Sequence, residues 1–130
     1  MVEQLEFHTF GFEKLEVWQK SIDFCQLVYS VSQEFPKEEI YGLSCQIKRA
    51  VISISSNIAE GSSKNLLKDQ ARFSEIAYGS LMEIIIQLIL AKKLGYLSEE
   101  IYTKCRNEAE ILSRLINAYK NSQVRRLNEK

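Results

Sequence analysis

The stretch from Leu43 to Gly61 reads LSCQIKRAVISISSNIAEG and repeats an apolar residue at nearly every helical turn. The apolar positions follow at steps of three or four residues: Leu43, Ile47, Ala50, Ile54 and Ile58. This spacing is typical of an α-helix with one buried face. Pro36 suits the first turn of a helix and Gly61 the position just past its end. The sequence therefore predicts a helix over about residues 37–60.

A line of polar residues runs beside this apolar stripe. Its members are Gln46, Arg49, Ser53, Asn57 and Glu60. At the angular step of an α-helix all five fall within about 80° of one another. Half-buried charges need partners, so we expect Arg49 and Glu60 to join through Ser53 and Asn57 in a hydrogen-bonded network. The alternative interpretation is a network that only fixes helix register, or a polar line exposed to solvent.

The segment predicted as the third helix adds two residues to this candidate interface, Gly79 and Glu83. A glycine inside a helix costs about 1 kcal/mol relative to alanine, and close approach of another helix would explain why it is kept. Glu83 is a charged residue within an otherwise apolar run. We therefore count both with the polar line as a predicted network or subunit interface.

Three further segments have the same helical spacing of apolar residues, over about residues 13–35, 66–93 and 98–122. Gly95 suits a helix end, and Ser98 with two following glutamates suits a helix start. Short loops make successive helices antiparallel neighbours. The prediction is an all-α chain, an antiparallel up-down-up-down four-helix bundle over 13–122, with an N-terminal extension (1–12) and a basic C-terminal tail (123–130).

Composition supports one helical domain: the chain has 130 residues, one proline and 45% hydrophobic residues. Three cysteines without a C-x-x-C pair fit a reduced cytoplasmic protein. We see no signal peptide. The richest apolar run, residues 81–94, is interrupted by polar residues and is too short to span a bilayer, so no membrane is expected.

The 17 basic and 17 acidic residues balance, so any binding of nucleic acid must rest on a local cluster. The predicted nucleic-acid contacts are Lys48, Arg49, Lys64, Lys68, Arg72, Lys120, Arg125 and Arg126, with Lys130 in the same tail. Solvated helix faces are the alternative interpretation. Three aromatic residues are candidates either for base stacking or for the core: Trp18, Tyr41 and Tyr78.

Several enzyme classes are unlikely on sequence grounds. A nucleophilic serine needs a base, and the only histidine, His8, precedes the first predicted helix. The stretch EGSSK lacks the spacing of a phosphate-binding loop. No E-x-x-H motif occurs, although di-metal bundles use it. We therefore expect no catalytic residue, no metal, no cofactor and no enzymatic activity.

The predicted third helix is apolar on nearly every side. Residues off its inner face are Met82, Ile85, Ile86, Ile89 and Leu90. A helix of this kind must be covered on more than one side. In so small a bundle a second copy of the chain would provide the cover, so we expect a homo-oligomer.

From Phe12 to about Tyr119 the sequence resembles the bacterial four-helix-bundle family whose founding members are encoded in intervening sequences of 23S ribosomal RNA genes. The resemblance rests on FEKLEVWQKS, FPKEEIYGLSCQIKRAVISISSNIAEG and ARFSEIAYGSLMEI. Two positions depart from the family pattern: Ser55 stands in place of proline, and Lys48 in place of the usual arginine. A serine restores a backbone donor, and a lysine loses the bidentate fork of arginine.

The resemblance implies an up-down bundle that assembles as a ring-shaped homopentamer without known catalytic activity. The chain also resembles the accessory protein of diversity-generating retroelements, which works with a reverse transcriptase and its template RNA through a basic surface. The expected function is that of a non-enzymatic oligomeric bundle that associates with RNA or a ribonucleoprotein. The alternative is a protein-interaction scaffold without nucleic-acid contact.

Overall fold

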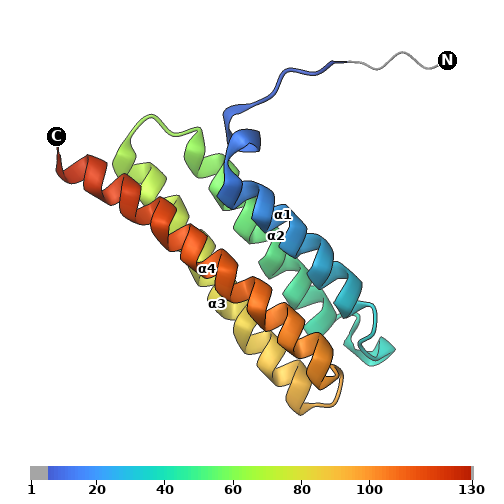
Figure 1. The fold of residues 1–130 in the computed structure, drawn as a ribbon. Helices are drawn as coiled ribbons and strands as arrows, with labels where there is room; N and C mark the ends of the chain where they lie inside the picture. Colours follow the sequence, from blue (N-terminus) through green and yellow to red (C-terminus); the bar gives the residue numbers. More distant parts are fainter. Residues whose placement is uncertain (1–5, 130) are drawn as a thin grey trace.

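The computed structural model describes residues 6–129, which contain helices and no strand. The α-helices are α1 (Glu16–Ser32), α2 (Leu43–Ser62), α3 (Leu67–Lys93) and α4 (Glu99–Asn128). Two short 3-10 helices precede α1 and α2, η1 (Gly11–Lys14) and η2 (Lys37–Glu39). Figure 1 shows the four long helices side by side with successive helices antiparallel. The predicted all-α four-helix bundle is confirmed.

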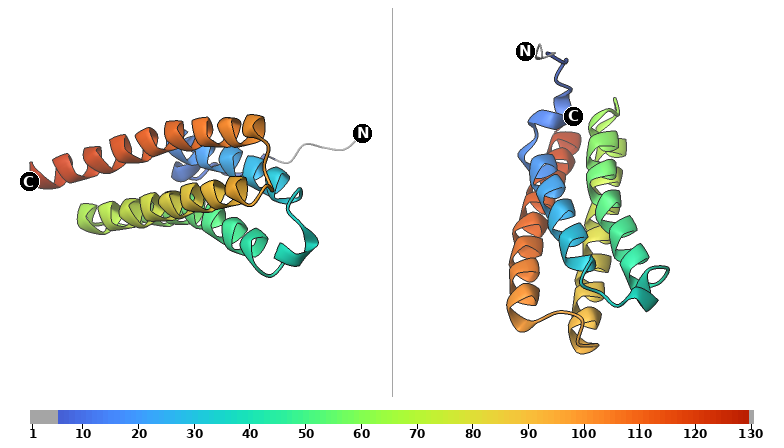
Figure 2. Two further views of the ribbon diagram at one scale, coloured as in Figure 1. Left: turned by 90° about the horizontal axis from the view of Figure 1, so that it is seen from below. Right: turned by 90° about the vertical axis from the view of Figure 1, so that its right-hand side faces the viewer.

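Each long helix packs against its neighbours in sequence, and α1 also contacts α4. Within the described residues no Cα atom of α1 lies within 8 Å of one in α3, and the same holds for α2 and α4. The helices therefore occupy the four corners of a square, with α1 diagonally opposite α3. The two further views in Figure 2 show the same arrangement.

The core lies where the four apolar stripes meet. Its largest fully buried apolar side chains are Val28, Ile47, Val51, Ile54, Ile58, Leu81, Ile84, Leu88, Cys105, Leu112 and Ile116. All five members of the predicted stripe from Leu43 to Ile58 are buried. Burial of one large aliphatic side chain contributes about 1.5–3 kcal/mol before entropic costs, so this shared core drives association of the helices.

The first two helices are shorter than predicted. Residues 11–14 form η1, where the Phe10 amide donates to Glu13 Oε2 at 2.7 Å, and α1 begins only at Glu16. After α1 the chain makes hydrogen bonds of the 3-10 type, such as Phe35 N to Ser32 O. The α-helix does not continue because Pro36 has no amide proton to donate. η2 then fills the start of the predicted second helix, and α2 begins at Leu43.

The third and fourth helices agree with the prediction at their starts, but α4 is longer. Ser98 is the predicted N-cap, and its hydroxyl accepts from the Ile101 amide at 3.2 Å. α4 continues to Asn128, so the described part of the predicted C-terminal tail is helical and not a separate segment. Gln123 is buried and accepts a hydrogen bond from Ser74, which holds this part of α4 against α3. Lys130 lies outside the described residues.

The prediction that Gly61 lies just past the end of the second helix is wrong. Gly61 lies inside α2, where a Cβ would come within 2.6 Å of the Phe73 Cβ, so this glycine permits close approach of α2 and α3. Gly79 has nothing within 4 Å of such a Cβ and does not serve packing within the chain. Gly95 does end α3 as predicted, with a φ of 81° that favours glycine.

α3 is the one helix in the described range that is long and apolar enough to cross a membrane, with a mean hydropathy of 1.5. The expectation from residues 81–94 considered only half of this helix. Length and composition of this kind are also those of a core helix, and α3 packs against both α2 and α4.

Candidate functional site

A small polar groove separates α2 from α3 and contains part of the predicted polar line. It has a volume of about 370 Å³. Its lining residues are Gln46, Arg49, Ala50, Ser53, Ser80 and Glu83. The hydroxyl oxygens of Ser53 and Ser80 lie 2.9 Å apart and form a hydrogen bond across the two helices. The structure therefore brings Gln46, Arg49 and Ser53 together with Glu83, as the spacing along α2 and α3 suggested.

Asn57 belongs to the same network, because its amide group donates to the carbonyl oxygen of Ser53 at 2.7 Å and to the hydroxyl oxygen at 3.0 Å. Glu60 does not. It lines a different cleft, beside η1, so the predicted link between Arg49 and Glu60 is wrong. Asn57 was expected to connect Ser53 with Glu60, but its amide donates back to Ser53, and no side-chain hydrogen bond joins Glu60 to the network among the described residues.

Ser80 was missed by the sequence interpretation. The signal was its position three residues before Glu83, which places both side chains on the same side of α3. Gly79, which was included, points to solvent and does not line the polar groove. Helical periodicity identifies the residues of one face but not the residues that meet it from another helix.

A line of apolar residues faces solvent along α3, and we call it the apolar ridge: Ile76, Ile86 and Leu90. Their side chains are 42%, 65% and 45% exposed. Gly79 and Glu83 are exposed on the same line. Of the residues predicted to need a partner chain, Met82 and Ile85 instead pack against the core of their own chain, while Ile89 is half-buried.

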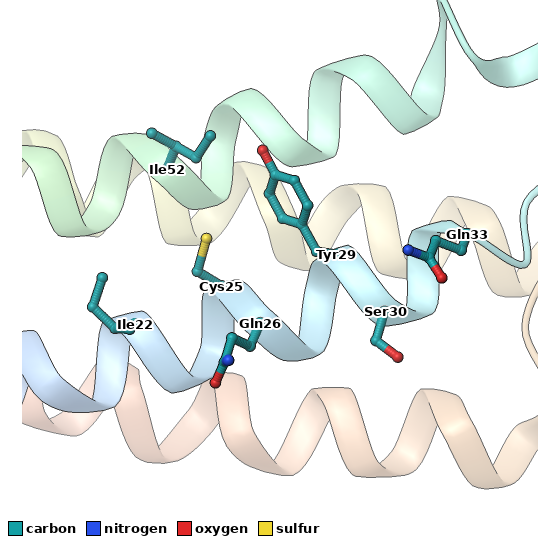
Figure 3. A pocket seen from close by; sticks show the side chains of 7 residues that line it. All are labelled: Ile22, Cys25, Gln26, Tyr29, Ser30, Gln33 and Ile52. Carbon is teal, nitrogen blue, oxygen red and sulfur yellow. The ribbon is translucent and has the colours of Figure 1, made fainter. Parts of the chain in front are cut away.

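A second apolar surface lies between α1 and α2, and we call it the apolar groove (Figure 3). It has a volume of about 530 Å³. It is lined by Ile22, Cys25, Gln26, Tyr29, Ser30, Gln33 and Ile52. Cys25 and Tyr29 point from α1 toward α2. The Lys48 ammonium lies over the Tyr29 ring, 5.3 Å from its centroid, and burial raises the pKa of the Cys25 thiol.

Six predicted nucleic-acid contacts lie at one end of the bundle, where α3 begins and α4 ends; we call it the basic end. They are Lys64, Lys68, Arg72, Lys120, Arg125 and Arg126. The antiparallel arrangement brings the two clusters together, as the Ser74–Gln123 hydrogen bond and the 3.1 Å ion pair of Lys120 with Glu75 show. The left view of Figure 2 shows the last turns of α4 projecting past the start of α3.

The charge at the basic end is positive but not uniform. Residues 63–75 and 118–129 hold six basic and three acidic side chains, a net charge of +3. Lys120 is partly neutralised by Glu75, and the Lys64 ammonium lies over the Phe73 ring at 5.2 Å. Arg125, Arg126, Lys68 and Arg72 are exposed to solvent.

The other two predicted nucleic-acid contacts do not lie at the basic end. Lys48 and Arg49 are near the start of α2, on the far side of the bundle from the ends of α2 and α4. Lys48 borders the apolar groove and Arg49 the polar groove. The basic residues can be listed from the sequence, but only the antiparallel order of the helices decides which groups of them meet in space.

The three candidate stacking aromatics differ in exposure. Trp18 and Tyr78 pack against the core, and Trp18 also meets the Phe12 ring edge-on at 4.8 Å. Tyr41 is 96% exposed in the turn before α2. Tyr41 is therefore the one of the three that presents a free ring face.

Three serines in the second half of α2 and at its C-cap are engaged in local hydrogen bonds. Ser55, Ser62 and Ser63 each donate to a carbonyl three residues earlier. His8 packs edge-on against Phe10 in the segment before η1. No group of three or more His, Cys, Asp or Glu side chains is arranged to hold a metal ion in the described part of the chain.

The sequence matches the model of the 23S rRNA-intervening sequence protein family over residues 13–118. The fold is similar to a crystal structure from Bacteroides thetaiotaomicron, a protein with unknown function from the S23 ribosomal protein family. The two share 23% sequence identity and a TM-score of 0.75, over 80% of this chain and 97% of that one. No curated protein matches the sequence.

Proposed function

This chain belongs to the 23S rRNA-intervening sequence protein family, and we propose that it is a non-enzymatic, self-associating helical bundle that binds RNA at its basic end. The observation that carries the proposal is the meeting of two basic clusters there, which are 48 residues apart in the sequence at their nearest members, Arg72 and Lys120. Four of their six side chains are exposed to solvent and available to phosphates.

The arrangement suits contact with a phosphate backbone more than recognition of bases. Lysine and arginine ends on mobile side chains neutralise phosphates without reading sequence. The last turns of α4, which carry Arg125 and Arg126, project past the start of α3 (Figure 2). The resemblance to the accessory protein of diversity-generating retroelements points in the same direction, because that protein works with RNA.

The absence of an enzymatic role is supported by the state of the polar side chains. The hydroxyls of Ser62 and Ser63 donate to backbone carbonyls, which leaves them without a base. The charged residues that line the polar groove are Arg49 and Glu83. The hydrogen bond between Ser53 and Ser80 in this groove joins α2 to α3. Self-association is supported by the apolar ridge, since exposed aliphatic residues in a line mark interaction surfaces.

The experiment is a salt titration of RNA binding. Fluorescence anisotropy with a structured RNA hairpin should give an affinity that falls linearly with salt on logarithmic axes. The variant Lys68→Ala/Arg72→Ala/Arg125→Ala/Arg126→Ala should bind more weakly, with a slope reduced by about 0.7–0.9 for each lost phosphate contact. The matched control is Lys93→Ala/Lys104→Ala, which removes two exposed lysines at the opposite end of the bundle.

Equal affinity of the quadruple variant and the control would contradict binding at the basic end. If the unmodified protein shows no binding at low salt, the alternative of a protein-interaction scaffold without nucleic-acid contact replaces the proposal. The apolar ridge is the observation that favours this alternative, since it offers a docking surface that does not depend on charge.

A further inference from the structure

We propose that the apolar ridge on α3 of one copy docks into the apolar groove between α1 and α2 of a second copy, so that copies join head to tail. The inference rests on the self-association in the proposed function and names the two surfaces that meet. It is independent of RNA binding, which takes place at the basic end.

The ridge has the properties of a surface that another helix covers. Ile76, Ile86 and Leu90 span fourteen residues, or about 21 Å of helix. Gly79 lies on the same line, is exposed and has no neighbour of its own chain within 4 Å of a Cβ position. A mid-helix glycine without an internal packing role leaves room for the backbone of a partner to approach closely.

The groove has the complementary form. Ile22, Cys25 and Tyr29 follow at helical spacing along α1, and Ile52 faces them from α2 (Figure 3). Ile52 and Tyr29 are 44% and 36% exposed, so both still have apolar surface to bury. No charged side chain lines this groove in the described residues, and its polar members are uncharged glutamines and a serine.

Charge favours docking of the ridge into a groove over pairing of the ridge with the ridge of a second copy. Glu83 lies at the midpoint of the ridge, seven residues from Ile76 and seven from Leu90. If two ridges paired by two-fold symmetry, the two Glu83 carboxylates would meet near the symmetry axis and repel each other. In the groove the same carboxylate instead finds Lys48, whose ammonium lies at the groove edge over Tyr29.

The apolar ridge of one copy cannot pack into the apolar groove of the same copy. α1 and α3 occupy opposite corners of the bundle, and no Cα atoms of the two helices lie within 8 Å of each other in the described residues. The two surfaces therefore match between copies and not within one. Contacts between two different surfaces repeat from copy to copy, and they form a ring when the rotation closes.

The test is a mixing experiment with two single variants, measured by light scattering at micromolar concentration. Ile86→Asp disables the ridge and leaves the groove intact, whereas Ile52→Asp disables the groove and leaves the ridge intact. Each variant alone should be monomeric. An equimolar mixture should form a dimer of one copy of each, because a single intact ridge and a single intact groove remain to join.

Ile111→Asp is the matched control, since Ile111 is 40% exposed on α4 and belongs to neither surface. It should assemble as the unmodified protein does. A mixture that stays monomeric would overturn the docking of ridge into groove. If Ile52→Asp assembles normally while Ile86→Asp is monomeric, the ridges pair with each other.

A second measurement does not require the aspartate variants to fold. Ile86→Cys in a Cys45→Ser background should cross-link oxidatively to Cys25 of the next copy and give a ladder of covalent species longer than a dimer. Cys25→Ser should abolish the ladder. A single dimer band that persists without Cys25 would contradict the head-to-tail order.

The two proposals fail in different ways. A monomeric unmodified protein would overturn self-association and this docking together, while RNA binding would still be measured by anisotropy. An oligomer that ignores both Ile86→Asp and Ile52→Asp would overturn the docking alone. Loss of RNA binding with intact ladder formation would overturn the RNA proposal alone.

Discussion

Gly61 of α2 lies directly against Phe73 of α3: a Cβ atom at position 61 would stand 2.6 Å from the Phe73 Cβ, closer than real Cβ contacts allow. Gly61 is buried, and the carbonyl oxygen of Gln70 also lies within 3.5 Å of that position. This contact sets the distance between α2 and α3 near the end where the basic clusters meet.

The variant Gly61→Ala should therefore be less stable than the unmodified protein, although alanine favours helix. Overpacking of this kind costs about 1–3 kcal/mol, which exceeds the gain in helix propensity of about 1 kcal/mol. The free energy of unfolding in urea measures the difference. Phe73→Ala in the same chain should not relieve this contact, because alanine keeps the Cβ atom that the new methyl group meets at 2.6 Å.

Gly79→Ala should have the opposite effect on the monomer. Nothing of the same chain lies near the new methyl group, so a gain of about 1 kcal/mol from helix propensity is expected. The comparison is best made in the Ile86→Asp background, where assembly does not contribute. In an otherwise unmodified chain the same substitution should weaken self-association, and an unchanged oligomer would argue that no partner backbone approaches Gly79.

The buried hydrogen bond of Ser74 to Gln123, at 2.7 Å, should hold the last part of α4 on the bundle. Ser74→Ala leaves the Gln123 carbonyl oxygen without this donor, and the Gln123 Nε2 already has no partner in the described residues. A loss of about 1–3 kcal/mol is expected. Hydrogen exchange should become faster over residues 120–128 before it changes in the rest of α4; uniform exchange along α4 would contradict this role.

The stability of the fold should decrease at alkaline pH through Tyr96. Its hydroxyl donates to Glu39 Oε2 at 2.9 Å, and this hydrogen bond, followed by desolvation, raises the pKa of Tyr96 above its ordinary value of 10.0. Since the pKa is higher in the folded state, the contribution is fully present below pH 10 and is lost as the pH rises through the folded pKa.

Tyr96→Phe should remove the hydrogen bond and reduce the alkaline loss. Thermal unfolding followed between neutral pH and pH above 10 would give a flatter profile for the variant. Burial also raises the pKa of Tyr119 and of Cys105, so part of the alkaline decrease should persist. A profile identical to that of the unmodified protein would assign the decrease to the other groups with a raised pKa, namely Tyr119, Cys105 and Cys25.

Much of the architecture follows from local patterns. The apolar stripe from Leu43 to Ile58, the cap at Ser98 and the turn at Gly95 lie in the sequence because helical period, capping and positive φ each depend on a few neighbouring residues. The helix ends were less predictable. The last part of α4 is held to the bundle by a hydrogen bond between Gln123 and Ser74, which is forty-nine residues away in the sequence.

The candidate sites divide in the same way. The polar line on α2 could be read from spacing, and Arg49 and Ser53 lie where that spacing places them. Their partner Ser80 could not be found, because no local pattern reveals which residue of a second helix will face them. The apolar groove was not anticipated either, since it exists only where the sides of α1 and α2 meet.

The sequence by itself determined that this protein is a bundle of four helices with a shared apolar core, because burial of periodic stripes and short loops leave few other solutions. Only the tertiary structure decided that Gly61, and not Gly79, is the point of close helix contact within the chain. It also decided that the two distant basic clusters share one end, while Lys48 and Arg49 do not. The physical reason is that periodicity acts over a few turns, whereas the distance and register of two helices are set by side chains that are far apart in the chain.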